Sequence, residues 1–270
     1  MPRLTVPHAE LDWELSDEGG APVVQLHGLT SSRYRDRLLD LDLGLGLSGT
    51  RLLRYDARGH GRSTGRKVPQ DYRWEALADD LLRLLDHVFP GEAVHGVGPS
   101  MGCGTLLHAI TRRPDRFSAL TLVVPPTAWE TRTAKSADYL EAADLVDREG
   151  FEAFVAVGAA VALPPATVGT PRTVPDVPKE MLSTLFRGAA LTDLPPRDAV
   201  ARIAVPTTVL AWTDDPSHPQ STAEELVSLV RGSRLVLASA PEDVARWPGL
   251  LHEQVQSRHG TRSGDPHSLS

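Results

Sequence analysis

The sequence predicts an α/β fold: a mostly parallel, doubly wound sheet with helices on both faces and one inserted all-helical segment. Short apolar runs, typical of buried strands, alternate with helical patterns over residues 1–125 and again over residues 206–256. Between Pro125 and Pro206 this alternation stops, and helical and proline-rich stretches follow one another. These observations predict a single sheet that is interrupted once by helices.

The strands and helices of this sheet are expected to alternate along most of the chain. The expected strands are residues 9–13, 23–26, 51–55, 93–97, 120–124, 207–212 and 235–238. The expected helices are residues 33–41, 74–88, 104–112, 223–230 and 243–255. Residues 74–88 carry the clearest signal, because Leu77, Leu81 and Leu84 fall on one stripe of a helix while Asp79 and Arg83 lie off it.

The insertion is expected to contain helices at residues 134–149, 151–161 and 180–190, with a proline-rich passage at 164–178. Helices inserted between two strands of a parallel sheet are typical of a lid over the carboxyl ends of the strands, where ligands bind. An ordinary helical excursion is the alternative. We therefore expect a core of residues 1–125 and 206–256, a helical cap of residues 126–205, and a disordered polar tail of residues 257–270.

The composition of the chain argues against several classes of binding partner. The formal net charge is −7 and no basic cluster is present, which argues against nucleic acid. No stretch reaches the ~20 apolar residues of a membrane span, and the N-terminus lacks a signal-peptide core. We therefore expect a cytoplasmic protein that acts on a small molecule. No metal-ligand cluster or dinucleotide fingerprint stands out, so no cofactor is expected, and Cys103 is expected to be a buried packing residue.

Ser100 is the residue to which the sequence gives most weight. It is the centre of a G-x-S-x-G pentapeptide at residues 98–102, between an expected strand and an expected helix. A serine on such a turn is the nucleophile elbow of hydrolytic enzymes, in which the flanking glycines permit a close strand–helix crossing. The alternative is an ordinary serine in a glycine-rich turn.

Three further motifs accompany the elbow. Leu26-His27-Gly28-Leu29 follows an early strand, D-A-R-G-H-G-R-S occupies residues 56–63, and residues 211–219 form an acid-bearing loop. In order and spacing, the four motifs resemble those of the α/β-hydrolase superfamily, in the branch with a helical cap between the sixth and seventh core strands. The resemblance spans most of the chain. It implies an esterase, lactonase, C–C hydrolase or haloperoxidase-like enzyme.

The resemblance also implies roles for individual residues. Ser100 would be the nucleophile and Asp215 the acid, with Asp214 as the competitor. The backbone N–H groups of Met101 and Leu29 would bind the developing oxyanion. His27 and Trp129 complete the expected oxyanion and substrate-binding set, His27 chiefly as a brace of its loop and Trp129 at the hinge of the insertion. Loop 56–63 would be structural, with Arg58 paired with a carboxylate.

The catalytic histidine of this family follows the last core strand, but residues 239–243 contain no histidine. The candidates beyond Asp215 are His218, His252, His259 and His267, with His218 as the provisional base; the remaining possibility is that no histidine serves. A serine without a base is a poor nucleophile. The first hypothesis is therefore hydrolysis of an ester or lactone of a small apolar substrate. The alternative is a lyase or cyclase of specialised metabolism, or a ligand-binding protein, that lacks a complete triad.

Overall fold

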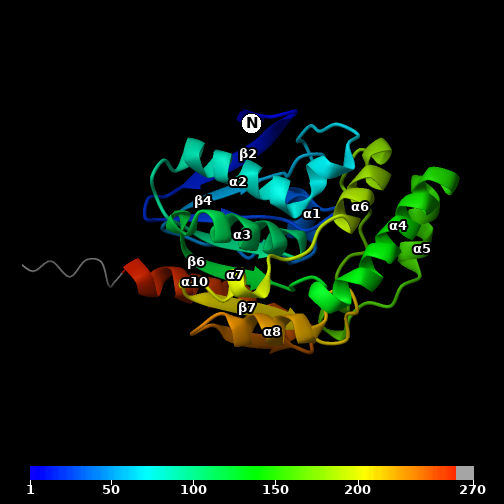
Figure 1. The fold of residues 1–270 in the computed structure, drawn as a ribbon. Helices are drawn as coiled ribbons and strands as arrows, with labels where there is room; N and C mark the ends of the chain where they lie inside the picture. The colour runs from blue at the N-terminus through cyan, green and yellow to red at the C-terminus, as the bar shows by residue number, and fades with distance from the viewer. Residues whose placement is uncertain (260–270) are drawn as a thin grey trace, which may run out of the picture.

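The computed structural model describes residues 1–259 and forms one eight-stranded sheet in the order β1-β2-β4-β3-β5-β6-β7-β8 (Figure 1). β1 and β2 pair antiparallel, β2 pairs antiparallel with β4, and every other neighbouring pair is parallel. The expected mostly parallel sheet is confirmed. The strands are β1 (Arg3–Val6), β2 (Ala9–Asp17), β3 (Ala21–Gln25), β4 (Thr50–Tyr55), β5 (Val94–Pro99), β6 (Phe117–Val123), β7 (Thr207–Trp212) and β8 (Arg234–Ala238).

Helices cover both faces of the sheet. The larger apolar cluster joins the sheet to α2, α3 and α8, and a second cluster joins its other face to α9 and α10. The α-helices are α1 (Arg33–Leu38), α2 (Trp74–Val88), α3 (Met101–Arg112), α4 (Arg132–Glu149), α5 (Phe151–Ala159), α6 (Leu182–Ala190), α7 (Arg197–Val200), α8 (Gln220–Leu229), α9 (Pro241–Val244) and α10 (Trp247–His259). Short 3-10 helices are η1 (Pro69–Tyr72), η2 (Pro114–Arg116), η3 (Trp129–Thr131), η4 (Pro165–Thr167) and η5 (Lys179–Met181).

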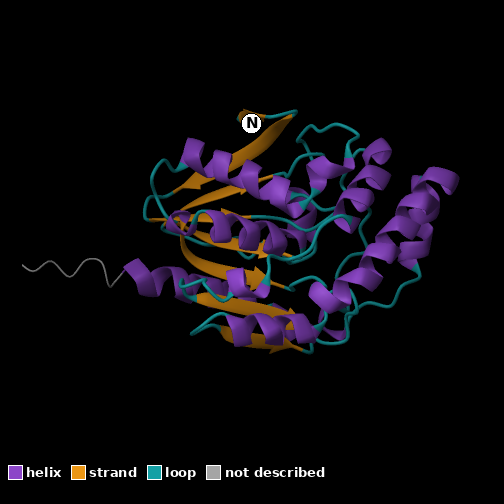
Figure 2. Cartoon of the chain, viewed as in Figure 1, coloured by secondary structure: helices purple, strands orange, loops and turns teal. Residues whose placement is uncertain are grey.

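The insertion between β6 and β7 is helical, as expected. α4, α5 and α6 gather beyond the carboxyl ends of the parallel strands, an arrangement consistent with a cap (Figure 2). The last part of the insertion packs against the sheet and not beyond it: Leu194, Val200 and Ile203 are buried in the main core cluster. The helices that stand away from the sheet therefore end near Ala190.

Several expected boundaries are corrected. β1 was missed because it is a four-residue edge strand with one fully buried side chain, Val6, so it lacks a clear alternation. The expected final helix is divided into α9 and α10. α10 continues to His259, so residues 257–259 of the expected tail are helical. The rest of that tail, 260–270, lies outside the described residues.

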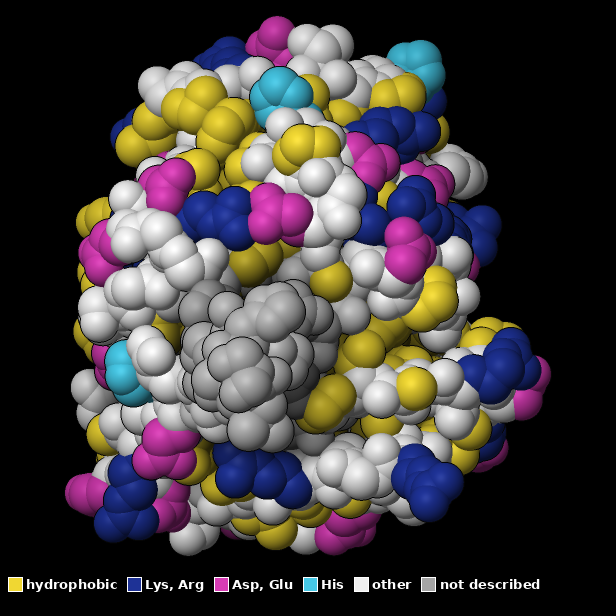
Figure 3. All heavy atoms as spheres, turned by 90° about the vertical axis from the view of Figure 1, so that its left-hand side faces the viewer, with side chains coloured by type: hydrophobic (Ala, Val, Ile, Leu, Met, Phe, Trp, Pro, Cys, Tyr) yellow, Lys and Arg dark blue, Asp and Glu magenta, His cyan; other side chains and the backbone are white. Residues whose placement is uncertain are grey.

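The surface at the amino ends of the strands carries mixed charge. Figure 3 shows Lys and Arg side chains interspersed with Asp and Glu on the face that is turned away from α4 and α5. Across residues 1–259, no helix combines the length and apolarity that crossing a bilayer requires.

A stability test follows from two helical glycines. A Cβ on Gly104 in α3 would overlap the buried indole ring of Trp74, whereas a Cβ on Gly158 in α5 would meet no atom within 4 Å. We expect Gly104→Ala to lower the free energy of unfolding by about 1–3 kcal/mol, as overpacking does. The matched control Gly158→Ala should raise it by up to about 1 kcal/mol through helix propensity. Urea unfolding measures both, and equal effects would contradict the close α2–α3 packing.

Candidate active site

The turn between β5 and α3 places Ser100 in a strained conformation. Its φ is 51° and its ψ is −110°, values that a non-glycine residue rarely adopts. A Cβ on Gly98 would lie 2.9 Å from the carbonyl carbon of Gly102, and a Cβ on Gly102 would lie 3.1 Å from Cβ of Leu26. The glycines of the pentapeptide therefore permit the close strand–helix crossing on which the turn depends.

His218 lies between Ser100 and Asp215. The Ser100 hydroxyl oxygen is 2.9 Å from Nε2 of His218, and Nδ1 of the same ring is 2.7 Å from Oδ2 of Asp215. A carboxylate can only accept, so Nδ1–H donates to Asp215 and Nε2 is left to accept the serine proton. The three side chains are therefore arranged in the order expected of a nucleophile, a base and an orienting acid.

A single tight turn explains how the acid and the histidine meet. Residues 215–218 read Asp-Pro-Ser-His, and the His218 N–H donates to the Asp215 carbonyl at 3.1 Å, which closes a β-turn with Pro216 in its second position. The Ser217 N–H donates to Oδ1 of Asp215 at 2.8 Å, a bond typical of aspartate at the start of a turn. This turn signature is the sequence signal that relates His218 to Asp215.

The carboxylate of Asp215 is held by three groups. Besides His218 and Ser217, the indole N–H of Trp212 donates to Oδ2 at 2.8 Å. Burial acts to raise the pKa of Asp215, but these hydrogen bonds and the charge of His218 outweigh it and hold that pKa well below its usual range. Asp214, the alternative acid, is exposed in a positive-φ turn and makes no contact with His218 within the described residues.

Of the other candidate histidines, the structure describes the side chain of His252 alone. His252 is exposed on α10, and the residues bonded to Ser100 Oγ do not include it. His259 ends α10 and nothing is described of its side chain, while His267 lies outside the described residues.

Two backbone N–H groups flank Ser100. Met101 is the first residue of α3, so its N–H has no acceptor within the helix. The loop that contains Leu29 abuts the elbow, because a Cβ on Gly28 would lie 3.7 Å from Cβ of Ser100. Within residues 1–259 the Leu29 N–H has no hydrogen-bond partner.

The His27 ring is buried and bonded to two backbone groups, which favours its bracing role over its place in the expected binding set. Its side chain is 3% exposed, and Nε2 accepts from the Ala57 N–H at 2.9 Å. Nδ1 is therefore the donor, to the Gly28 carbonyl at 2.8 Å. Burial lowers the pKa of His27. The neutral ring braces the loop before Leu29, which is the role chiefly expected of it.

Trp129 also makes bracing contacts, through both its backbone and its indole ring. Its N–H donates to the Asp193 carboxylate at 3.0 Å, and its indole N–H donates to the Pro195 carbonyl at 3.1 Å. The guanidinium of Arg197 lies 4.5 Å from its ring centroid. Trp129 therefore ties the start of the insertion to its end.

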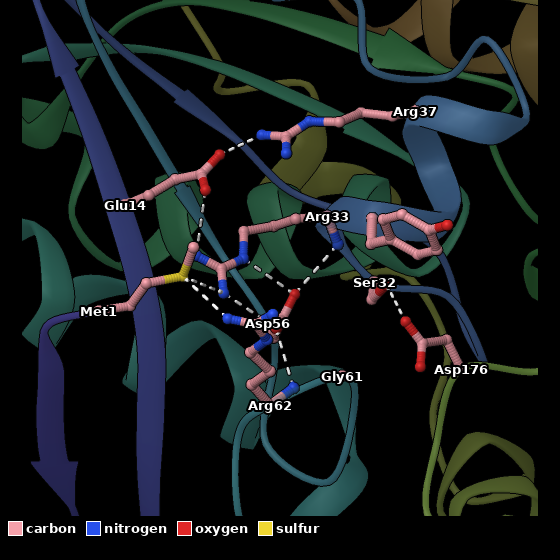
Figure 4. A pocket seen from close by; sticks show the side chains of 10 residues that line it. Met1, Glu14, Ser32, Arg33, Arg37, Asp56, Gly61, Arg62 and Asp176 are labelled. Carbon is pink, nitrogen blue, oxygen red and sulfur yellow. Dashed lines mark hydrogen bonds and ion pairs between the residues drawn. The ribbon is translucent and has the colours of Figure 1, made fainter.

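Loop 56–63 is held by buried ion pairs. Asp56 accepts from the Arg33 guanidinium at 3.1 Å and from the Arg62 N–H at 3.0 Å, as Figure 4 shows. Arg58 donates to both oxygens of Asp80 at 2.7 Å, so it is paired with a carboxylate as predicted. These contacts give the loop a structural role beside the site.

The insertion contacts the turn that carries the histidine, a feature that the sequence did not predict. Lys135 in α4 donates to the Ser217 hydroxyl at 3.1 Å, and the Thr127 N–H donates to the Ser217 carbonyl at 3.2 Å. Ser217 precedes His218, so α4 is bonded directly to the turn. Within the described part of the chain, no three His, Cys, Asp or Glu side chains are grouped to hold a metal ion.

Comparison with known proteins identifies the family. Residues 21–157, just over half of the chain, match the model of the family described as alpha/beta hydrolase fold. The chain belongs to this family. The resemblance of the four motifs to the α/β-hydrolases is confirmed.

Several α/β-hydrolase relatives have known activities. The 3-oxoadipate enol-lactonase 2 of Acinetobacter baylyi is 28% identical over 171 residues, which cover 60% of each chain and thus less than two thirds of that enzyme. A non-heme haloperoxidase of Rhodococcus erythropolis is 27% identical over 91% of this chain and 90% of its own.

Solved structures of the family superimpose over nearly the whole molecule. A hydrolase from Pseudomonas aeruginosa PA01 is 26% identical, with a TM-score of 0.75 over 95% of this chain and 97% of its own. The enol-lactonase from Burkholderia xenovorans LB400 is 24% identical, with a TM-score of 0.75 over 95% and 98% of the two chains, and it shares the fold.

The bond from Trp212 to Asp215 can be tested without knowing the substrate. Trp212→Phe removes the indole donor and keeps an aromatic ring against Trp247, whose ring centroid is 6.0 Å away. Hydrogen bonds to charged groups contribute about 1.5–3 kcal/mol, so we expect labelling of Ser100 by a fluorophosphonate to slow about tenfold or more. Trp13→Phe is the control, because the Trp13 indole N–H is buried without a partner among the described residues. Equal labelling rates in the two variants would refute a positioning role for Trp212.

Proposed function

We propose that this protein hydrolyses an ester or lactone of a small, mostly apolar substrate, with Ser100 as the nucleophile. The observation that carries the proposal is the unbroken series of hydrogen bonds from Ser100 Oγ through His218 to Asp215. A serine becomes a useful nucleophile when a base is within hydrogen-bond reach and a third group orients that base.

The proposed reaction follows from these contacts. Ser100 Oγ attacks the carbonyl carbon of the substrate while its proton passes to Nε2 of His218, and Asp215 stabilises the imidazolium. The tetrahedral intermediate collapses, the bond to the leaving oxygen breaks, and His218 returns the proton to that oxygen. Water then attacks the acyl-serine by the same steps, which releases the acid and restores Ser100.

The N–H groups of Met101 and Leu29 are the proposed oxyanion donors. Met101 follows Ser100 directly and Leu29 lies in the loop that abuts it, and neither N–H has an acceptor within residues 1–259, so both are available to the negative charge that develops on the carbonyl oxygen. Losing one such donor in comparable enzymes costs about 3 kcal/mol of transition-state stabilisation.

The apolar substrate class rests on the side chains around Leu29. The Leu29 side chain packs against the core and against both apolar clusters of the insertion, one around Leu185 and Met181 and the other around Leu182 and Phe186. We propose that α4–α6 form the cap of the site. The lactonase and esterase names among the compared proteins agree with the ester or lactone part of the proposal.

The non-hydrolytic alternative depended on the lack of a base. Its support is weaker because His218 is hydrogen-bonded to Ser100 and so supplies the base that hydrolysis needs. One relative, a putative synthase of Bacillus subtilis that is 31% identical over 53% of this chain, keeps the alternative worth testing.

Two variants test the proposal directly. Ser100→Ala should abolish both p-nitrophenyl acetate hydrolysis and fluorophosphonate labelling, because no acyl-enzyme can form. His218→Ala should retain the serine but slow both reactions about 10⁴-fold, as removal of a triad member does.

His252→Ala is the matched control, since this exposed histidine lies on α10 and should leave both rates unchanged. A folded wild-type protein that is neither labelled nor active would favour the ligand-binding alternative. Full activity in His218→Ala would exclude His218 as the base.

A further inference from the structure

Helix α1 carries three arginines, and one of them lacks an ionic partner. Arg33 forms ion pairs with Asp12, Glu14 and Asp56, and Arg37 forms them with Glu14 and Asp42. Arg35 forms no ion pair with any described residue.

The guanidinium of Arg35 is held only by neutral oxygens. Nε donates to the Thr173 hydroxyl at 2.8 Å, and Nη1 donates to the carbonyl and hydroxyl oxygens of Thr30 at 3.1 and 3.2 Å. Nη2 has no hydrogen-bond partner within the described residues, so two of its donors are unused. Burial lowers the pKa of Arg35, although the charges of Asp36 and Asp176 act in the opposite direction.

Arg35 lines a pocket whose charge is unlike that of the chain. The pocket has a volume of about 340 Å³. It lies between α5, residues 170–175, and α1 with the residues that flank it, Thr30 and Leu39. Its lining contains two arginines, Arg35 and Arg172, and no acidic residue, although the whole chain has a net charge of −7. The remaining wall is mostly apolar and includes Phe154, Val155 and Leu163.

We propose that this pocket binds an amphipathic carboxylate, with the carboxylate on Arg35 and the apolar chain along α5. A carboxylate would supply the counter-ion that Arg35 lacks and would accept from Nη2, in the planar geometry that guanidinium groups favour. The side chains of Phe154, Val155 and Leu163 would remove the chain from water. The volume is within the range of small-molecule sites.

The pocket adjoins the candidate active site without including it. Thr30 follows Leu29, and the Thr30 carbonyl accepts from both Arg35 and the Asp176 N–H, so the pocket lies against the end of the oxyanion loop. Ser100 and His218 are not among its lining residues. The proposal therefore does not depend on hydrolysis and can be tested in the Ser100→Ala variant.

The charge of the ligand is tested with octanoate and octanol. Calorimetric titration of the full chain should show that octanoate binds more tightly than octanol. Arg35→Met retains an unbranched stem and removes the donors, so it should weaken octanoate binding about 10-fold to 100-fold, as loss of a charged hydrogen bond does, and leave octanol unchanged. No binding of octanoate, or equal binding by wild type and Arg35→Met, would overturn the proposal.

The location is tested by filling the pocket. Gly158 lines it, has no unusual φ and has no atom within 4 Å of a Cβ, so Gly158→Leu adds a side chain to the pocket without straining α5. This variant should abolish octanoate binding. Ala156→Leu is the control, because Ala156 is exposed on the same helix and does not line the pocket. Loss of binding in both variants, or in neither, would contradict the assigned location.

The origin of the carboxylate is distinguished by competition. If octanoate inhibits p-nitrophenyl acetate hydrolysis competitively and Gly158→Leu removes that inhibition, the pocket receives the acidic part of a substrate or product. If octanoate binds without competing, including to Ser100→Ala, the pocket receives a separate acid. Failure of the hydrolysis assay alone bears on Ser100 and His218 and leaves the binding measurement intact.

Discussion

The β-turn at residues 215–218 is the constraint on which the candidate site depends. Pro216 restricts the backbone of the turn, and the hydrogen bond from His218 N–H to the Asp215 carbonyl closes it. Residues 216–218 therefore set both the position of the Asp215 carboxylate and the orientation of the His218 imidazole. Asp215 and His218 both lie just after β7, and neither comes from the segment after β8. That segment has another role, because the Ser239 and Ala240 N–H groups donate to Asp243 at the start of α9.

The turn is fixed on two sides by different parts of the molecule. On the core side, Trp212 donates to Asp215, and its ring stacks on Trp247 of α10 within the second apolar cluster. On the side of the insertion, Ser217 accepts hydrogen bonds from Lys135 and Thr127. Ser217 also donates its own N–H to the Asp215 carboxylate, so the insertion is connected to Asp215 and to the neighbouring His218 through this one residue.

The features that the sequence predicted are those set by local patterns. α2 has the predicted bounds, Trp74–Val88, because its leucine stripe and polar face leave one helical register. The turn at Ser100 follows from glycine spacing, since Gly98 and Gly102 touch across it. The roles of His27 and Trp129 were not predictable, because nearness to a motif does not say which way a side chain points. Both side chains turn toward backbone groups that are distant in sequence, Ala57 and Pro195. β1 was not predicted because an edge strand of four residues is stabilised by pairing with its neighbour and has too few residues for a clear alternation of apolar and polar side chains.

The spacing of the arginines on α1 explains why one of them lacks a carboxylate. Arg33 and Arg37 are four residues apart, so they share one face of the helix, and that face meets acidic side chains of β2 and of the loops before and after β4. Arg35 is rotated by about 200° from Arg33 and extends to the opposite side, toward Thr173 of the insertion. Asp12 and Glu14 of β2 and Asp56 after β4 neutralise the first face. On the opposite side the hydrogen-bond partners of Arg35 are the oxygens of Thr30 and Thr173, and no described carboxylate forms an ion pair with it.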